Sequence, residues 1–348
     1  MWYGVILMPD EENKVQGILY GRKWEIKIYK PAYKTDEKGN KERDPEKDIA
    51  IDVSELRCIF KTSYAVGTVA QLGTLVVYNM NAETEKEVIT EGFQLSVYGG
   101  YEQGQYGHIY TGDIIQVIRN RENGIDYRLE ILAMRGSGPV DQNFSCATMA
   151  AQSLPRDQVN IVCRNAKEKL PVGAVSENLS QQPLPRGKVI FGTVGKYLRD
   201  IAIANNAHFG ITDEGTVEMK CINDEIPEGM VLKLTPTTGL VGTPKYTDSG
   251  IQIKMLLDPR VKINTMVHID NSINQRHLIS VTQTTEGPKI NGVNQKTQFD
   301  DDGDYEVFSV THSMDTWGDE WTTDVVGVGR NGRTGFLAMT ATSSQVVL

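Results

Sequence analysis

The 348-residue sequence has few cysteines, few histidines and no long apolar run. Its four cysteines, Cys58, Cys146, Cys163 and Cys221, are far apart and form no C-x-x-C pair. They predict neither a disulfide framework nor a zinc site, so we expect small reduced core residues in a protein that folds in a cytoplasm. No stretch approaches the ~18 uncharged apolar residues of a membrane span, and none is expected.

Recognisable catalytic and cofactor motifs are also absent. None of the five histidines stands in a dense ligand spacing, and there is no G-x-S-x-G elbow. "GVGRNG" at 327–332 matches G-x-G-x-x-G by letter, but it runs into "RTGFLAMTATSS", so we expect a glycine-rich strand end there. "DDDGDYE" at 300–306 lacks the EF-hand spacing and predicts an acidic turn. We therefore expect no cofactor, no metal site and no catalytic residue.

The charge balance is acidic, with 36 basic and 45 acidic residues and a formal net charge of −9. Surfaces that grip nucleic acid or anionic lipid need clustered Lys and Arg, so this balance argues against both partners. We expect no specific nucleic-acid binding, although the totals are compatible with a local basic patch.

Residues 1–136 predict a first β unit. Six short runs alternate apolar and polar residues between glycine-rich or polar turns, which is the pattern of half-buried strands. In "LRCIF", for example, Leu56, Cys58 and Phe60 share one face. Six runs at this spacing predict a barrel or a sandwich. They lie at 24–30, 56–62, 74–80, 92–101, 108–118 and 126–136.

Two segments interrupt the strands of this first unit. Residues 34–48 are charged, mixed in sign and free of apolar side chains, so they cannot bury a face and predict an exposed loop. Residues 81–89 predict a short helix, with Asn81 as its N-cap and acidic residues in its first turn.

Residues 137–230 predict a small α+β region. Apolar residues recur at helical spacing in two stretches, and a hairpin pattern follows the second. In an alternative division, residues 137–168 complete the β unit that follows and 169–230 are inserted into it. We expect helices at 155–166 and 193–207, the second capped by Thr193, and a hairpin turn at 213–215.

Residues 231–332 predict a second barrel-like β unit. "GIQIKMLLDP" alternates apolar and polar residues, and residues 261–270 resume the alternation after a turn in which Pro259 fixes φ. Residues 333–348 are small and polar and predict a flexible tail. The expected fold class is mainly β with a smaller α+β part, comprising two β-barrels and an inserted or intervening α+β region.

The string "HSMDTWGDEWTTD" at 312–324 is the most distinctive in the sequence, because Trp317 and Trp321 lie close together with Asp315 beside them. Three interpretations stay open. Exposed tryptophans with carboxylates stack sugar rings, tryptophans also anchor protein interfaces, and a hairpin can pack one tryptophan beneath its loop. We take Trp317, Trp321 and Asp315 as candidate interface residues.

Several strings, taken in order, resemble the central baseplate hub proteins of tailed bacteriophages, a family with two tail-tube-like barrels. They are "LPRGKVIFGTVGKYLRDIAIANNAHFGITDEGTVEM" (184–219), "TGLVGTPKYTDSGIQIKMLLDPRVKINTMVHIDNS" (238–272) and "GDYEVFSVTHSMDTWGDEWTTD" (303–324). In the first unit, "LVVYNMNAETEKEVI" followed by "FQLSVYGGY" and "IYTGDIIQVI" resembles the tail-tube barrel itself.

The resemblance implies a structural virion protein and not an enzyme. Three subunits with two barrels each would form a trimeric ring of six barrels that matches a hexameric tail tube and lets DNA pass. The implied partners are further copies of the chain and the tail tube, spike, tape measure and baseplate wedge proteins. The implied location is the tail baseplate, after assembly in the host cytoplasm. The alternatives are a cell-wall or polysaccharide hydrolase and a carbohydrate-binding tail adhesin.

Overall fold

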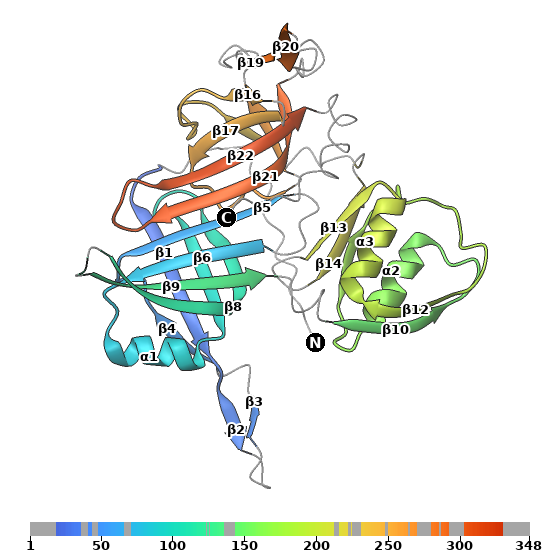
Figure 1. Cartoon of the computed structure of the whole chain (residues 1–348), viewed down its shortest axis with the longest axis horizontal. Helices are drawn as coiled ribbons and strands as arrows, with labels where there is room; N and C mark the ends of the chain where they lie inside the picture. The colour runs from blue at the N-terminus through green and yellow to red at the C-terminus, as the bar shows by residue number, and fades with distance from the viewer. Residues whose placement is uncertain are drawn as a thin grey trace.

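The computed structural model describes a mainly β protein with a smaller α+β part, so the expected fold class is confirmed (Figure 1). One large sheet runs through two β units. Of the three helices in the described residues, one packs with this sheet and two belong to a separate α+β unit. No helix in the described part of the chain is long and apolar enough to cross a membrane. The described residues are 19–35, 41–43, 48–65, 71–122, 124, 126–135, 143–211, 216–221, 224, 231–247, 250–263, 265–269, 280–284, 287–291 and 303–329.

The first β unit curls seven strands of the sheet around one core. Leu75 and Val77 of one strand are fully buried, whereas their neighbours Thr74, Val76 and Tyr78 are only partly buried, as the sequence alternation predicts. Buried residues from six of the seven strands form one cluster, so the strands enclose a shared interior. In spatial order the strands are β5 (Cys58–Ala65), β6 (Gln71–Tyr78), β9 (Asp126–Arg135), β8 (Tyr106–Glu122), β7 (Gln94–Tyr101), β1 (Arg22–Lys30) and β4 (Ile49–Asp52).

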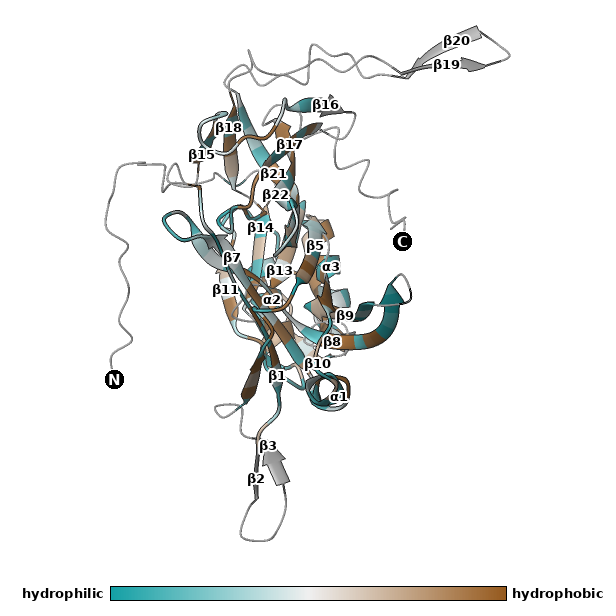
Figure 2. Cartoon of the chain, turned by 90° about the vertical axis from the view of Figure 1, so that its left-hand side faces the viewer, coloured by the Kyte–Doolittle hydropathy of each residue, from teal (hydrophilic) through white to brown (hydrophobic). Residues whose placement is uncertain are grey.

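Helix α1 (Ala82–Glu91) lies at one end of this unit, as Figure 2 shows. The side chain of Asn81 accepts a hydrogen bond from the backbone amide of Glu83 at 3.2 Å, which satisfies a donor that a helix start leaves unpaired. Val88 is fully buried in the core of the unit. The expected helix and its N-cap are confirmed, and the helix extends two residues beyond the expected end.

The second β unit lies above the first in Figures 1 and 2 and continues the same sheet. Strand β21 joins the two units, since Asp304–Glu306 pair with β18, whereas Ser309–Asp315 pair with β5 of the first unit. A bulge between Val307 and Ser309 separates these two pairings. The strands of the unit are β15 (Val231–Leu234), β16 (Lys245–Thr247), β17 (Gly250–Leu256), β18 (Met266–Ile269), β21 (Asp304–Asp315) and β22 (Trp321–Gly329).

Two expectations about these β units were wrong. The strand expected at 261–270 begins only at Met266, because the turn at Pro259 is followed by further turn residues that connect the two cores. In the same stretch Met266 is buried, although strict alternation from Val261 would place it on the polar face. The expected loop at 34–48 contains two short strands, β2 (Tyr33–Thr35) and β3 (Lys41–Arg43), which pair antiparallel.

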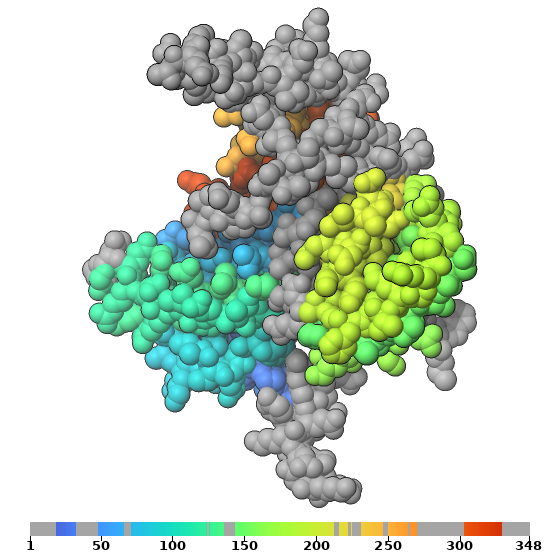
Figure 3. All heavy atoms as spheres, turned by 45° about the vertical axis from the view of Figure 1, so that its right-hand side comes forward, coloured from blue at the N-terminus to red at the C-terminus, as the bar shows by residue number. Residues whose placement is uncertain are grey.

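The α+β unit has a separate core formed by two helices between two small sheets. Figure 3 shows it as a rounded body beside the first β unit. The guanidinium of Arg135 donates to the carbonyl of Ile211 at 3.2 Å and links this unit to the large sheet. Its elements are β10 (Phe144–Met149), α2 (Pro155–Arg164), β11 (Val172–Val175), β12 (Lys188–Thr193), α3 (Val194–Ala204), β13 (Ala207–Ile211) and β14 (Val217–Cys221).

Both helices expected in this region are confirmed, with ends two or three residues earlier than expected. Thr193 occupies the N-cap of α3, but its side chain makes no capping hydrogen bond. Strands β13 and β14 pair as the expected hairpin, and its expected turn at 213–215 lies outside the described residues. The limits proposed from the sequence at residues 136, 230 and 332 stay predictions.

The cysteine expectation is confirmed for three residues and wrong for one. All four cysteines are free, and Cys58, Cys163 and Cys221 are buried. Cys146 is exposed on β10. Strands β19 (Ser280–Thr284) and β20 (Gly287–Asn291) form a further hairpin. Residues 1–18, the acidic turn expected before Gly303 and the C-terminal tail lie outside the described residues.

Candidate functional site at the joint between the two β units

The turn between β21 and β22 is organised by Asp315. One carboxylate oxygen of Asp315 accepts hydrogen bonds from the amides of Trp317 at 3.0 Å and Gly318 at 2.9 Å. The other oxygen lies 3.0 Å from the guanidinium of Arg57 on the first unit. A Cβ on Gly318 would lie 2.3 Å from this carboxylate, so a larger residue there would displace the Asp315 side chain. Asp315 therefore shapes the turn and fastens it to the first unit.

The electrostatic setting of Asp315 follows from these contacts. Burial alone would raise the pKa of its carboxyl group, because the charged form loses water. The hydrogen bonds from Arg57 and from the two turn amides outweigh burial and hold the pKa of Asp315 below its ordinary value. A carboxylate with these partners stays ionised at neutral pH and acts as a structural acceptor.

Trp317 and Trp321 lie in opposite environments. Trp321 is 1% exposed, packs edge-on against Trp24 at 5.8 Å between ring centroids, and belongs to the first unit's core. Trp317 is 71% exposed. The structure therefore brings the three candidate residues into one turn but gives them different surroundings. The assignment of these residues to a protein interface stays a prediction. Of the three, only Trp317 exposes most of its side chain to solvent.

Residues of strands β1 and β5 also contact the turn between β21 and β22. Arg22 donates to the carbonyl of Gly318 at 2.5 Å, and its guanidinium lies 5.4 Å from the centroid of the Trp321 ring. The amide of Cys58 donates to the hydroxyl of Thr316 at 2.9 Å, and the amide of Thr316 donates back to the carbonyl of Cys58 at 3.0 Å. The end of the second unit's hairpin is thus bound to two strands of the first.

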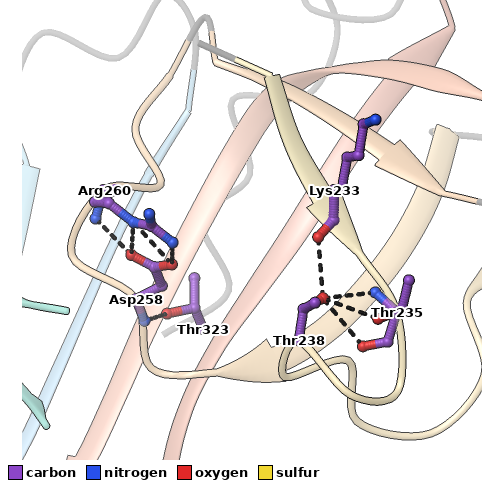
Figure 4. A network of polar contacts seen from close by, with 6 residues as sticks. All are labelled: Lys233, Thr235, Thr238, Asp258, Arg260 and Thr323. Atoms are coloured by element: carbon purple, nitrogen blue, oxygen red, sulfur yellow. Dashed lines mark hydrogen bonds and ion pairs between the residues drawn. The ribbon is translucent and has the colours of Figure 1, made fainter. Parts of the chain in front are cut away.

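The "LLDPR" turn crosses from one core to the other, and Figure 4 shows its Asp258 and Arg260 beside Thr323. Leu257 is buried in the core of the first unit, whereas Val261 is buried in the core of the second. The amide of Asp258 donates to the hydroxyl of Thr323 at 3.2 Å, and the guanidinium of Arg260 meets the carboxylate of Asp258 with a shortest distance of 2.7 Å. This bidentate ion pair within three residues fixes the turn.

His312 completes the joint from β21. It is 2% exposed, and its Nδ1 lies 2.9 Å from the same Thr323 hydroxyl that accepts from Asp258. Burial lowers the pKa of His312 to about 4, only partly opposed by the negative charge of Asp258. The imidazole is therefore neutral at physiological pH and serves as a packing and hydrogen-bonding residue.

A second turn in Figure 4 supports the outer strands of the second unit. The hydroxyl of Thr238 donates to the carbonyl of Lys233 at 2.9 Å and accepts from the amide of Thr235 at 2.7 Å. The amide of Leu240 donates to the carbonyl of Thr235 at 3.1 Å, and Leu240 then forms a bridge with Met255 of β17. The turn thereby connects β15 to β17, another strand of the same large sheet.

These contacts make the two β units one structural body. The hydrogen bonds and ion pairs described above fix the turns of the joint. No group of three or more His, Cys, Asp or Glu side chains within the described ranges could hold a metal ion. Sequence reasoning missed Arg22, Arg57 and His312, because their partners lie roughly 250 residues or more away or on a neighbouring strand. The string at 312–324, which supplied Asp315, Trp317 and Trp321 as candidates, was the sequence signal that fell at the joint.

Comparison with known proteins defines the fold. No family model and no curated protein matches the sequence. Among solved structures, a 43 kDa tail protein of prophage MuSo2 from Shewanella oneidensis matches with a TM-score of 0.51 and 9% identity, over 88% of this chain and 98% of that one. At this identity the likeness concerns the fold. The chain therefore has the fold of a phage tail protein, and the sequence resemblance is confirmed at that level.

Two further matches have lower scores. A tail protein from Neisseria meningitidis MC58 gives a TM-score of 0.49 at 10% identity, covering 91% of this chain and 99% of that one. An Escherichia coli component of the type VI secretion system, described as similar in structure to the T4 tail proteins gp27 and gp5, gives 0.45 at 12% identity, covering 80% and 74%.

Proposed function

We propose that this chain is a structural protein of a phage tail, the central baseplate hub that forms a trimeric ring between tail tube and spike. The supporting observation is the tail-protein fold, which extends over 88% of this chain and 98% of the prophage protein. The joint supports the same proposal, because a hub must keep two β units in fixed relation while it bears load from both sides.

The internal duplication gives the ring its geometry. Two tube-like units in each of three subunits provide six units, which is the number needed to continue a hexameric tube. Three chains of −9 carry −27, and a ring with this charge repels the phosphates of DNA. The lumen would pass DNA without holding it. The tube, spike, tape measure and wedge proteins are the proposed neighbours, in the baseplate of the virion.

We propose no enzymatic activity for the chain. A hydrolase that uses the acids beside the tryptophans needs a carboxyl group free to transfer protons or attack a sugar. Asp315 is instead committed to Arg57 and to two turn amides. A zymogram on peptidoglycan or capsule checks this, and clearing that disappears in Asp315→Asn would favour the hydrolase.

Multi-angle light scattering of the purified chain tests the hub proposal. The expected result is a concentration-dependent trimer whose mass is three times that of the chain. Addition of the spike protein from the same phage should stabilise the trimer, because the two are neighbours in the proposed assembly. A chain that stays monomeric at high concentration, with and without the spike, would contradict the hub assignment.

A further inference from the structure

The α+β unit shares no apolar core with the β units in the part of the chain that the structure describes. All residues of its own apolar cluster lie between Ala147 and Cys221. The two β units, by contrast, share side chains, since Leu257 and Trp321 of the second unit are buried in the core of the first. Parts of a chain that lack a large apolar interface turn relative to each other unless polar contacts hold them. Polar contacts therefore set the orientation of the α+β unit.

Arg135 makes such a contact from the last residue of β9, where the chain leaves the large sheet for the α+β unit. One nitrogen of its guanidinium donates to the side-chain oxygen of Gln71 on β6 at 3.4 Å. The other terminal nitrogen donates to the carbonyl of Ile211 on β13 at 3.2 Å. A single planar group with several donors thus bridges the large sheet and the α+β unit.

The sheet side of this bridge is held firmly. Gln71 is 8% exposed, and its amide nitrogen donates to the hydroxyl of Thr62 at 3.0 Å. The hydroxyl of Tyr110, a fully buried residue, donates to the backbone carbonyl of Gln71 at 3.3 Å. Gln71 also lies directly opposite Arg135 in the pairing of β6 with β9. The hydrogen bond to Ile211 is therefore the part of the bridge that can open while the sheet stays intact.

The carbonyl of Ile211 accepts from outside its own hairpin because β13 ends at this residue. Ile211 lies opposite Val217 in the pairing of β13 with β14, but the amide of Val217 donates to the carbonyl of Pro171 at 2.9 Å. That amide is thus not the donor for Ile211. The guanidinium of Arg135 supplies a donor instead, which a backbone carbonyl at a strand end needs.

We propose that Arg135 is a releasable latch for a hinged α+β unit. With the hydrogen bond to Ile211 formed, the unit has the orientation shown in Figure 3. With this bond open, the unit turns relative to the large sheet while the apolar cores stay folded. A hydrogen bond from a charged group favours the latched orientation roughly tenfold or more. A partner that binds only the open orientation would select it. The inference concerns a single chain and holds with or without a ring.

Two spin labels, one on each part of the molecule, measure this orientation. Cys146 takes the label on the α+β unit, because it is exposed and the other three cysteines are buried. Glu83→Cys provides the second site, in the exposed first turn of α1 on the first β unit. The labelled chain is diluted into an excess of unlabelled chain, so that pulsed electron paramagnetic resonance reports distances within one molecule. We expect one narrow distance distribution when Arg135 is present. A broad distribution in this parent chain would overturn the latch.

Arg135→Met should release the unit, because methionine keeps an unbranched side chain but donates no hydrogen bond. The ratio of latched to open chains should fall roughly tenfold or more, and the distance distribution should broaden. Arg128→Met is the matched control, since Arg128 lies on the same strand and pairs with Glu130 of that strand at 3.6 Å. The control should keep the narrow distribution. An unchanged distribution in Arg135→Met, or equal broadening in both variants, would contradict the proposal.

Arg135→Ala is the second variant and guards against a folding defect of the first. It removes the guanidinium without placing a new apolar side chain beside the connection between the units, and it should broaden the distribution as Arg135→Met does. Circular dichroism and tryptophan fluorescence check that the variants are folded before distances are compared. A folded Arg135→Ala chain with the narrow distribution of the parent would show that other contacts hold the unit, and the latch would be wrong.

Discussion

The joint between the β units and the face of the α+β unit use similar residues in opposite ways. At the joint, Trp321 is buried, and Asp258 and Asp315 are each paired with an arginine inside the chain. On the outward side of strands β10 and β12, Phe191 and Val189 stay exposed, and Lys188 lies against the ring of Tyr197. The comparison separates side chains that are buried or paired within the chain from side chains that stay exposed on its surface.

The largest effect is expected from Trp321→Ala, which removes the biggest fully buried side chain of the joint. The free energy of unfolding should fall by about 4 kcal/mol, from lost burial and the cavity left behind. Denaturant unfolding measures the change. Trp317→Ala is the matched control and should change stability by less than about 0.5 kcal/mol, because Trp317 is 71% exposed. Equal losses would mean that the two tryptophans do not differ as described.

Leu198→Ala tests whether the α+β unit is stabilised by its own core. Leu198 is fully buried between the helices of this unit, so the unit should lose about 3 kcal/mol. All four tryptophans lie outside residues 143–224, so tryptophan fluorescence follows the β units alone. We expect an earlier unfolding transition by circular dichroism and an unchanged one by fluorescence. A shared shift would show that the two parts unfold together.

Acid should weaken the joint through His312. Its pKa falls from 6.5 to about 4 on folding, so below pH 6.5 the unfolded chain binds a proton that the folded chain refuses. Stability should therefore fall from pH 6.5 to about 4, by about 3 kcal/mol in total, and this contribution levels off below pH 4. Unfolding measured against pH checks this, and His312→Asn should flatten the curve in that window.

Asp315→Asn should cost about 2 kcal/mol, because an amide cannot pair with Arg57 as a carboxylate does. The loss is measured at neutral pH by denaturant unfolding. The lowered pKa of Asp315 adds stability above its ordinary pKa, and this stability is lost as pH falls through the folded value. That window lies at more acidic pH than the window of His312. In a double-mutant cycle with Arg57→Met, the interaction energy between the two residues should account for most of this loss.

Local patterns predicted much of the fold. The strands of the first unit follow period-two alternation, and the capped helix at Asn81 follows from the chemistry of its cap. The alternation of residues 261–270 predicted a strand that starts too early. Val261 is buried, but it lies in the connection that follows the turn at Pro259 and not in a strand. Cys146 was expected in the core, since sequence alone does not show that a two-stranded sheet has only one covered face.

The contacts at the joint could not be predicted from local sequence patterns, for a physical reason. Arg57 and Asp315 are 258 residues apart, and Arg22 and Gly318 are 296 apart, so only the folded sheet brings them together. Trp317 and Trp321 look equivalent in the sequence, yet the turn sends one outward and packs the other inward. Tertiary contacts, and not the spacing of residues, assign these side chains their roles.

Electron microscopy of the assembled protein tests the central claim most directly. The claim is that two rigidly joined β units per chain build a hub ring from three chains. The expected result is a ring of three subunits in which six β units surround an open channel, with the α+β units outside them. Particles that are monomeric, or that form a closed assembly with no channel, would contradict it.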